Sequence, residues 1–224
     1  MPLVDLNLDL GDLPNDPAAL YGLATVVSIA CGGHAVDIAS MARAVSFAMA
    51  RGTKIAARPS YPEGVGAGAG EALAASVEQQ CKALQSIARK LGFPAAIVKP
   101  HGALYQDAAS DPAIARALLD GAARGLGRED LTVIGPSHGA LFDEAQRRGV
   151  RYAREGFADR ASGAEGKLIA RITDRAVVVR QAVALASSGT IEIISVQAGT
   201  AGAALIAGDV REALIQNGYL AGNL

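Results

Sequence analysis

The feature that most limits what this chain can fold into is a regular alternation of short apolar segments with longer amphipathic ones. The apolar segments are mostly continuous in hydrophobic character, which is typical of strands buried on both faces. Strict alternation of strands and helices predicts a parallel sheet. Strands are expected at residues 4–8, 26–30, 54–57, 95–98, 131–134, 151–153 and 190–196, the sixth being the weakest.

Amphipathic helices are expected between these strands, because apolar residues recur there every three to four positions. Asp111 followed by Pro112 is a helix start signal, with the aspartate as the cap and the proline in the first turn. Gly149 is placed to cap the end of another helix. The helices are expected at residues 37–51, 71–91, 111–119, 140–148, 174–188 and 201–216.

The number of strand–helix units limits which α/β architectures are possible. About seven units are too many for a small open sheet and one short of the eight-stranded barrel. The pattern alone is consistent with a distorted, roughly seven-stranded parallel β/α barrel of the TIM-barrel kind and with a doubly wound sheet. No linker or change of composition divides the 224 residues, so one domain spanning residues 1–224 is expected.

Composition argues against several classes of partner. The formal net charge is -1, so the chain lacks the basic surplus that binds a nucleic-acid backbone. No apolar run is long enough for a membrane span, and the amino terminus has no signal-peptide pattern. Cys31 and Cys81 are far apart in sequence and form no disulfide framework. We therefore expect a cytoplasmic protein that binds neither nucleic acid nor membrane; its oligomeric state is left open, a homo-oligomer included.

Polar residues gather where the expected strands end. In parallel α/β folds the loops at the carboxyl ends of the strands meet at one site, so these side chains are expected to converge. Converging charged and imidazole groups shift one another's pKa, which makes them candidates for acid–base chemistry. The residues are Asn7, Asp9, Cys31, His34, Asp37, Arg58, Ser60, Tyr61, Lys99, His101, Tyr105, Ser137, His138, Glu155, Asp159, Arg160 and Gln197.

Lys99 carries the strongest signal in this set. A lysine at the end of an apolar strand is partly desolvated and needs a partner, so Lys99 and His101 are predicted to belong to the site. Other members have structural interpretations as well. Asp9 fits a turn, Asp37 fits a helix cap, His34 fits a tight turn, His138 a strand–helix turn, and Arg160 could form a structural bridge with Asp159.

Three further kinds of chemistry have weaker support. Asp9, His34 and His101 form a plausible metal-ligand set, although their spacing is not local. Cys31 is interpreted as a buried small residue rather than a thiolate nucleophile. The glycine-rich stretch at residues 64–70 matches no nucleotide-binding pattern and is interpreted as a surface loop, with a lid over the site as the functional alternative.

Five motifs, in order along the chain, resemble those of one known family. The resemblance is to the family of 5-oxoprolinase A subunits (the lactam-utilisation or LamB/YcsF family). The opening DLNLDLG is similar to the family's D-L-N-x-D-x-G-E, and VKPHGALY matches V-K-P-H-G-A-L-Y completely. The motifs lie at residues 5–11, 29–37, 59–63, 98–105 and 155–161 and span most of the chain.

The resemblance implies a distorted barrel of about seven strands and the A subunit of a bacterial ATP-dependent 5-oxoprolinase. Such an enzyme opens the lactam of 5-oxoproline to glutamate together with B and C subunits, which are expected to bind the ATP. No cofactor is assigned to this chain, although a divalent metal is compatible. The predicted catalytic residues are Asp9, His34, Lys99 and His101, and the predicted substrate-binding residues are Asn7, Arg58, Tyr61, Tyr105, Asp159 and Arg160. Asp9 or His101 would position water, and Lys99 would stabilise developing negative charge.

The chain departs from the family pattern at several positions. Arg58 stands where the family has histidine, and a guanidinium cannot act as a base near neutral pH. It could instead bind the carboxylate of 5-oxoproline. Gln197 stands in place of a histidine, and the glycine stretch replaces an arginine-containing loop. Three interpretations stay open: an active hydrolase subunit, a non-catalytic barrel that binds a partner or ligand, and a metal-dependent amide or acetyl hydrolase. For the first, Lys99→Ala is expected to abolish turnover with little change in folding.

Overall fold

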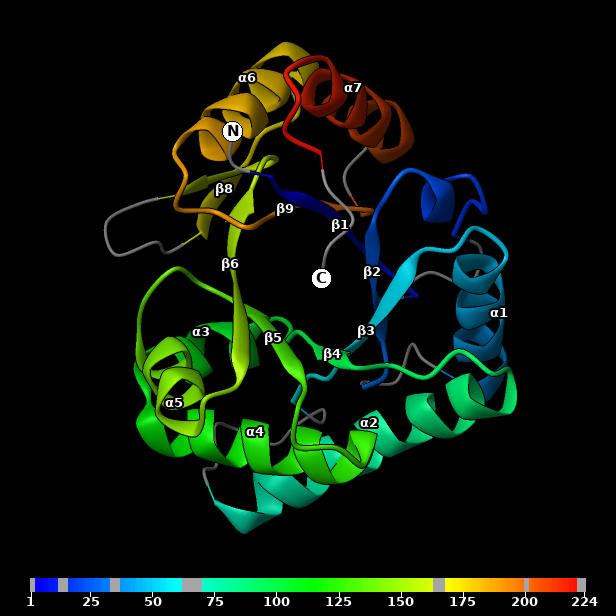
Figure 1. Cartoon of the computed structure of the whole chain (residues 1–224), viewed down its shortest axis with the longest axis vertical. Coiled ribbons are helices and arrows are strands. Elements are labelled where there is room, and N and C mark those ends of the chain that lie inside the picture. The colour runs from blue at the N-terminus through cyan, green and yellow to red at the C-terminus, as the bar shows by residue number, and fades with distance from the viewer. Residues whose placement is uncertain are drawn as a thin grey trace.

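Parallel strands of the described residues close into a seven-stranded barrel, seen end-on in Figure 1. The computed structural model describes residues 3–11, 16–32, 37–61, 70–162, 168–199 and 202–220. Pairing of the first strand with the last closes the barrel, for example with Asn7 opposite Ser195. This closure confirms the distorted β/α barrel and excludes the doubly wound sheet. In order around the barrel, the strands are β1 (Asp5–Leu10), β2 (Val26–Ala30), β3 (Lys54–Arg58), β4 (Ile97–Val98), β5 (Thr132–Gly135), β6 (Arg151–Phe157) and β9 (Ile193–Gln197).

Helices surround the barrel on its outside (Figure 1). Polar side chains fix where several begin: the Asp37 carboxylate accepts a hydrogen bond from Ser40 N at 2.6 Å, and the Ser40 hydroxyl accepts one from Asp37 N. Asp111 and Asp174 cap two others with their carboxylates. The helices are η1 (Leu20–Gly22), α1 (Ile38–Met49), α2 (Glu71–Lys90), α3 (Ala103–Ser110), α4 (Pro112–Leu126), α5 (Ala140–Arg148), α6 (Arg175–Ser187) and α7 (Ala203–Gln216).

The structure differs from the sequence-based elements in several places; α4, for example, runs seven residues beyond its predicted end at 119. α3 was not predicted, because it has only eight residues and starts at Gly102 without a side-chain cap. A short antiparallel hairpin of β7 (Arg160–Ser162) and β8 (Leu168–Arg171) follows β6, and its strands are too short to show a period. β6 itself runs four residues beyond the predicted end at 153, because charged and glycine residues interrupt its apolar character.

Side chains alternate along each barrel strand between two buried regions. One region lies between the strands and the helices, and the other lies inside the barrel. Along β1, Leu6, Leu8 and Leu10 belong to the main apolar core that packs with the helices, while the residues between them are polar and buried. A second, smaller cluster holds one apolar residue from each of the other barrel strands, as expected for the barrel interior. We call it the apolar layer: Val26, Ala56, Ile97, Ile134, Ala153 and Ile193.

Two helices on the outside of the barrel approach each other unusually closely. At Gly121 of α4, a Cβ atom would lie 2.3 Å from the carbonyl oxygen of Ala74 on α2. At Gly125, one turn later, a Cβ atom would lie 2.5 Å from the carbonyl oxygen of Glu78. Since real Cβ atoms do not approach backbone oxygens this closely, glycine is required at both positions for α4 to lie against α2.

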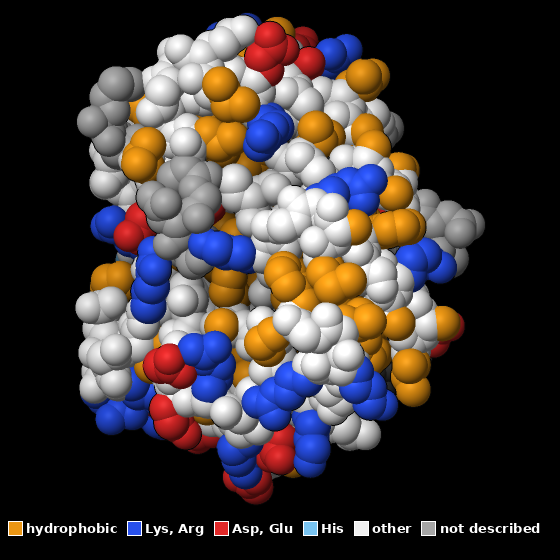
Figure 2. Space-filling model, turned by 45° about the vertical axis from the view of Figure 1, so that its right-hand side comes forward, with side chains coloured by type: hydrophobic (Ala, Val, Ile, Leu, Met, Phe, Trp, Pro, Cys, Tyr) orange, Lys and Arg blue, Asp and Glu red, His pale blue; other side chains and the backbone are white. Residues whose placement is uncertain are grey.

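The molecular surface is mixed in character. Figure 2 shows a face on which basic, acidic and hydrophobic side chains are interspersed, consistent with the net charge of -1. Among the helices of the described ranges, none is both long enough and apolar enough to cross a bilayer.

Candidate functional site

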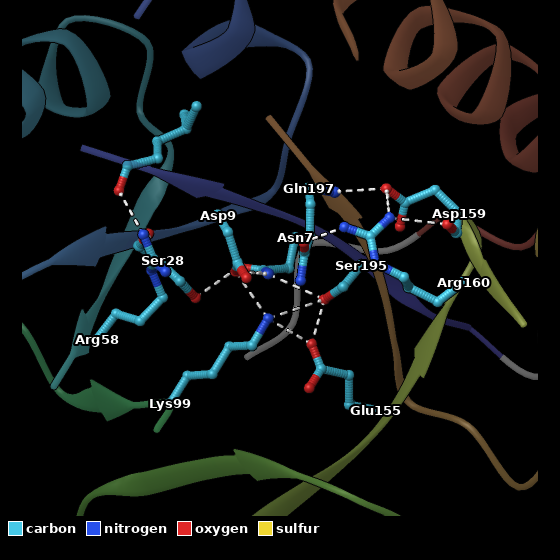
Figure 3. Close-up of polar contacts among 11 residues, drawn as sticks. Asn7, Asp9, Ser28, Arg58, Lys99, Glu155, Asp159, Arg160, Ser195 and Gln197 are labelled. Carbon is cyan, nitrogen blue, oxygen red and sulfur yellow. Dashed lines mark hydrogen bonds and ion pairs between the residues drawn. The ribbon is translucent and has the colours of Figure 1, made fainter. Parts of the chain in front are cut away.

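Lys99 lies at the centre of a buried polar cluster inside the barrel. It is the residue after β4, and only 1% of its surface is exposed. Its Nζ atom lies 2.7 Å from Asp9 Oδ1 and 2.6 Å from Glu155 Oε1, and it donates to Ser195 Oγ at 3.4 Å (Figure 3). An ammonium group has three N–H donors. All three therefore have an oxygen partner, and the partners come from three adjacent strands, β1, β9 and β6.

Hydrogen bonds connect the remaining polar side chains to this centre. Asn7 Nδ2 donates to Asp9 Oδ1 at 3.0 Å and to Ser195 Oγ at 2.9 Å, and Asn7 Oδ1 accepts from Ser28 Oγ at 2.7 Å. Ser195 Oγ in turn donates to Glu155 Oε1. A buried polar network of this kind fixes the position of every member. We call it the polar layer: Asn7, Asp9, Ser28, Lys99, Glu155 and Ser195.

The polar layer lies one step nearer the carboxyl ends of the strands than the apolar layer. Ser28, Lys99, Glu155 and Ser195 each follow a member of the apolar layer by two residues, so they share its inward direction. Arg58 follows Ala56 in the same way. The barrel interior is therefore apolar toward the amino ends of the strands and charged toward their carboxyl ends. The carboxyl ends are where the site was predicted.

Neighbouring charges outweigh burial at both members of the central ion pair. Burial alone would raise the pKa of Asp9, but the Lys99 ammonium and the Arg58 guanidinium lower it to about 2. Burial alone would lower the pKa of Lys99, but the carboxylates of Asp9 and Glu155 raise it above its ordinary value. The Phe157 ring lies 5.0 Å from Nζ and adds a cation–π contact. Asp9 and Lys99 are therefore both charged at neutral pH.

Arg58 is held largely by main-chain oxygens. It is 1% exposed, and it donates from Nε to Ser28 O at 3.2 Å and from Nη2 to Leu10 O at 3.3 Å. These bonds connect the end of β1 with the middle of β2. They support a structural role, and its predicted contact with a substrate carboxylate stays a prediction.

Asp159, Arg160 and Gln197 form a second cluster beside the first. Arg160 Nη1 donates to Asp159 Oδ2 and to Asp159 O, each at 2.8 Å, and Arg160 Nη2 donates to Gln197 Oε1. Gln197 N donates to Asp159 Oδ2 at 3.2 Å. The cluster joins the end of β9 to the residues after β6, which is the structural bridge that the sequence left open for Asp159 and Arg160.

Of the two predicted aromatic residues, Tyr105 lies beside the polar layer, whereas Tyr61 packs against the main apolar core and interacts with Asp107. Tyr105 of α3 is buried and packs edge-on against Phe157, with ring centres 5.9 Å apart. Burial and the nearby Glu155 carboxylate raise the pKa of the Tyr105 hydroxyl, so it stays protonated. Burial and Asp107 raise the pKa of Tyr61 to about 12. Both hydroxyl groups are therefore neutral hydrogen-bonding groups over the physiological range.

The three histidines differ in position. His101 is partly buried, its backbone N–H donates to Pro59 O at 3.0 Å, and its imidazole lowers the pKa of Asp9 when it is protonated. His138 is exposed after β5 and contacts Ser137. His34 lies outside the described residues, as do residues 64–69 of the glycine-rich stretch, so the predictions for both remain predictions.

The predicted metal set is only partly described. Within the described ranges, no group of three or more histidine, cysteine, aspartate or glutamate residues is arranged to hold a metal ion. Asp9 Oδ1 already accepts hydrogen bonds from Asn7 and from the Lys99 ammonium. A metal ion at this carboxylate would be repelled by the ammonium, which argues against Asp9 as a ligand.

The two cysteines are close together in the fold although they are fifty residues apart in sequence. Both are buried as free thiols. A hydrogen bond with Cys31 and burial raise the pKa of the Cys81 thiol well above its ordinary value. The burial of Cys31 fits its interpretation as a buried small residue.

Sequence reasoning missed several members of the polar layer. Glu155 is among the polar residues at strand ends but not among the predicted catalytic or substrate-binding residues, and Ser28 and Ser195 are in neither set. The sequence does contain a signal for them: each lies inside or at the end of a strand, in phase with the inward-facing positions, where an apolar side chain would be expected. The site prediction considered polar residues near the ends of the strands, so it did not use this two-residue period within the strands.

The low pKa of Asp9 predicts a loss of stability in acid. A carboxyl group whose folded-state pKa is depressed stabilises the protein above its unfolded pKa, and this stabilisation disappears as pH falls through the folded pKa. With values of 3.8 and about 2, the contribution is about 2 kcal/mol and should vanish between about pH 4 and pH 2. In urea unfolding, Asp9→Asn should be less stable than wild type at pH 7, and the difference should shrink over that window. Asp143→Asn, an exposed change on α5, is the control; a pH-independent deficit of Asp9→Asn would contradict the assignment.

Fold and site together define a β/α-barrel protein whose interior, near the carboxyl ends of the strands, holds a buried acid–lysine network. The LamB/YcsF family matches residues 4–218. The chain therefore belongs to the LamB/YcsF family.

Similar proteins cover nearly the whole chain. A protein from Streptomyces coelicolor, named as the A subunit of 5-oxoprolinase, is 37% identical over 95% of this chain and 96% of its own length. The protein of the same name from Nocardia farcinica is 38% identical, over 96% and 92%. Among solved structures, the lactam utilization protein from Thermus thermophilus has a TM-score of 0.87 and 28% identity, covering 97% of this chain and 98% of its own.

Proposed function

We propose that this chain is the A subunit of an ATP-dependent 5-oxoprolinase, which hydrolyses the activated lactam of 5-oxoproline to glutamate together with B and C subunits in the cytoplasm. The observation that carries the proposal is the similarity to proteins named as 5-oxoprolinase A subunits over nearly the whole length of both chains. The geometry adds support, because motif residues ninety positions apart, Asp9 and Lys99, form one buried ion pair at the predicted end of the barrel.

The reaction defines what the site has to do. Water adds through its oxygen to the carbonyl carbon, the carbon–nitrogen bond of the ring breaks, and the nitrogen takes up a proton. A lactam is a poor electrophile, so ATP has to activate it. The sequence contains no phosphate-binding loop, and we assign ATP binding and activation to the partner subunits. This chain would then receive the activated ring and add water to it.

The charges in the site distribute the roles among the residues. A carboxylate with a pKa of about 2 is a weak base near neutral pH, so Asp9 would orient water or the ring by accepting a hydrogen bond. His101 is close enough to affect the pKa of Asp9, and a neutral imidazole is the side chain best suited to take a proton from water at neutral pH. Lys99 has its three donors engaged, so it would act as a fixed positive charge rather than as a direct donor to the substrate.

Reconstitution with the cognate B and C subunits tests the proposal. Glutamate should form from 5-oxoproline only when ATP and all three subunits are present. His101→Ala should reduce turnover by about 100-fold or more, because proton transfer by a positioned side chain contributes about that much. His138→Ala, an exposed histidine after β5, is the matched control and should keep wild-type turnover. A correctly assembled wild-type complex without turnover would instead favour a barrel that binds a partner or ligand without catalysis.

A further inference from the structure

We propose that Glu155 and Ser195 are positioning residues, which hold the Lys99 ammonium centrally in the barrel and keep one oxygen of Asp9 available to the substrate. The inference deepens the proposed function, on which its catalytic part rests. It concerns the same site but two residues that were not among the predicted catalytic or substrate-binding residues. Their placement, their bonds to Lys99 and the consequence for Asp9 each support it.

Glu155 and Ser195 lie on adjacent strands and face Lys99 from the far wall of the barrel. β9 lies between β6 and β1, so Glu155, Ser195 and Asp9 occupy three neighbouring strands, while Lys99 reaches them from the end of β4. The side chain of Glu155 is fully buried, and its Oε1 atom lies 2.6 Å from Nζ. A buried charge is stable only when it is paired, so Lys99 and Glu155 restrict each other's position.

Ser195 orients the two ions with respect to each other. Its hydroxyl oxygen accepts hydrogen bonds from Asn7 Nδ2 at 2.9 Å and from Lys99 Nζ at 3.4 Å, and its proton goes to Glu155 Oε1. Because a hydroxyl has only one proton, donation to Glu155 leaves its lone pairs for the two nitrogen donors. The hydroxyl therefore connects the carboxylate of β6 to the amide of β1 through β9.

The second carboxylate determines how Asp9 is used. Both hydrogen bonds that Asp9 receives within the described residues go to Oδ1, from Asn7 and from Lys99. Glu155 draws the ammonium toward β6, so Lys99 does not bridge both oxygens of Asp9. Oδ2 remains as an ionised acceptor for water or for an N–H group of the ring. Without the Glu155 charge, the ammonium would move toward Asp9 as its one remaining carboxylate partner.

Other groups around the cluster complete its electrostatic setting. Arg58 and His101 act on Asp9 from β3 and from the segment after β4, and Tyr105 of α3 acts on Glu155. Phe157 covers Nζ from β6. None of these four residues donates to or accepts from Nζ in a hydrogen bond or ion pair within the described residues. Glu155 and Ser195 are therefore the two residues, besides Asp9, that bond directly to Nζ within the described residues.

The test uses Glu155→Gln and Ser195→Ala, with Glu192→Gln as the matched control. Glutamine keeps the shape and an acceptor oxygen but removes the charge. Glu192 is a partly exposed carboxylate that pairs with Arg154 at 3.1 Å, outside the polar layer. Glu155→Gln removes a charge, whereas Ser195→Ala removes a hydroxyl group. If one of the two variants does not fold, the other still tests the positioning of Lys99. Circular dichroism establishes that each variant is folded.

The first readout is the nitrogen–proton NMR signal of the Lys99 ammonium in the purified chain. The chain has five lysines, so lysine-selective ¹⁵N labelling gives few signals, and the one absent in Lys99→Met belongs to Lys99. Buried, hydrogen-bonded protons exchange slowly with water, which makes this signal observable. It should shift or disappear in Glu155→Gln and Ser195→Ala and stay unchanged in Glu192→Gln. An unchanged signal in both site variants would overturn the positioning role.

The second readout is steady-state kinetics of the assembled three-subunit complex. Both site variants should lower kcat by about 10-fold or more while KM changes much less, because misplacing a reacting group affects the transition state more than ground-state binding. Wild-type kcat in both variants, despite a changed Lys99 signal, would overturn the link to catalysis. If the wild-type complex itself shows no turnover, the proposed function fails, and the NMR readout still decides whether Glu155 and Ser195 position Lys99.

Discussion

Lys99→Met should reduce the free energy of unfolding by about 3–5 kcal/mol at neutral pH. The change removes the ammonium that pairs with Asp9 and Glu155, and both carboxylates are then buried without that counter-ion. Such groups favour their protonated form, so the deficit should become smaller as pH falls from 7 toward 5. Urea unfolding followed by circular dichroism at both pH values measures the effect. Turnover of the reconstituted complex should be abolished in the same variant.

Lys82→Met is the control for this experiment, since Lys82 is exposed on α2. It should change stability by less than about 0.5 kcal/mol at either pH. The structure thereby revises the sequence-based expectation that Lys99 can be replaced with little change in folding. A Lys99→Met protein as stable as wild type at pH 7 would mean that the ion pairs to Asp9 and Glu155 do not form in solution.

Gly121→Ala should destabilise the fold by about 2–3 kcal/mol, because the added methyl group cannot be accommodated without separating α4 from α2. The new Cβ atom would lie 2.3 Å from the carbonyl oxygen of Ala74 and 2.8 Å from Val77 Cβ. Backbone on the facing helix cannot move aside as a flexible side chain would. Thermal and urea unfolding should both report the loss, and the urea m-value should be unchanged because the unfolded state is the same.

The matched control is Gly208→Ala, which lies within α7 with no atom near the position of the added methyl group. Alanine favours helix over glycine, so this variant should be more stable than wild type by about 0.5–1 kcal/mol. The two substitutions are chemically identical and should have opposite signs. Equal effects at both positions would show that helix propensity, and not the close approach of α4 to α2, determines the outcome.

The sequence predicts the strands of the barrel well because each carries its own local signal, whereas closure of the sheet into a barrel was implied by the family resemblance. The mostly apolar run at residues 26–30 predicts both ends of β2 correctly. Asp37, Asp111 and Gly149 likewise mark helix ends at the positions found in the structure. β6 was predicted too short, because Arg154 and Gly156 interrupt its apolar run. The β7–β8 hairpin was missed, because three- and four-residue strands carry no readable period.

The site was predictable in part for a different reason. The need of Lys99 for a buried partner follows from one residue and its neighbours. The identity of the partners does not, because it depends on closure of the barrel between β1 and β9, which brings Asn7 beside Ser195. Ser195 stands out only as a polar residue at an inward-facing position of an apolar strand, and that pattern does not say which groups it bonds to. Its role becomes visible only when Glu155 and Lys99 are placed on either side of it.

The six side chains of the apolar layer limit how small molecules can enter and leave the barrel interior. They come from six of the barrel strands and are at most 4% exposed, so they plug the lumen at the amino-terminal side of the charged network. Under the proposed function, reactant, water and product would then share a single entrance at the carboxyl ends of the strands. A partner protein that delivers the activated ring would have to bind over that entrance, and the product would leave only after the partner withdraws.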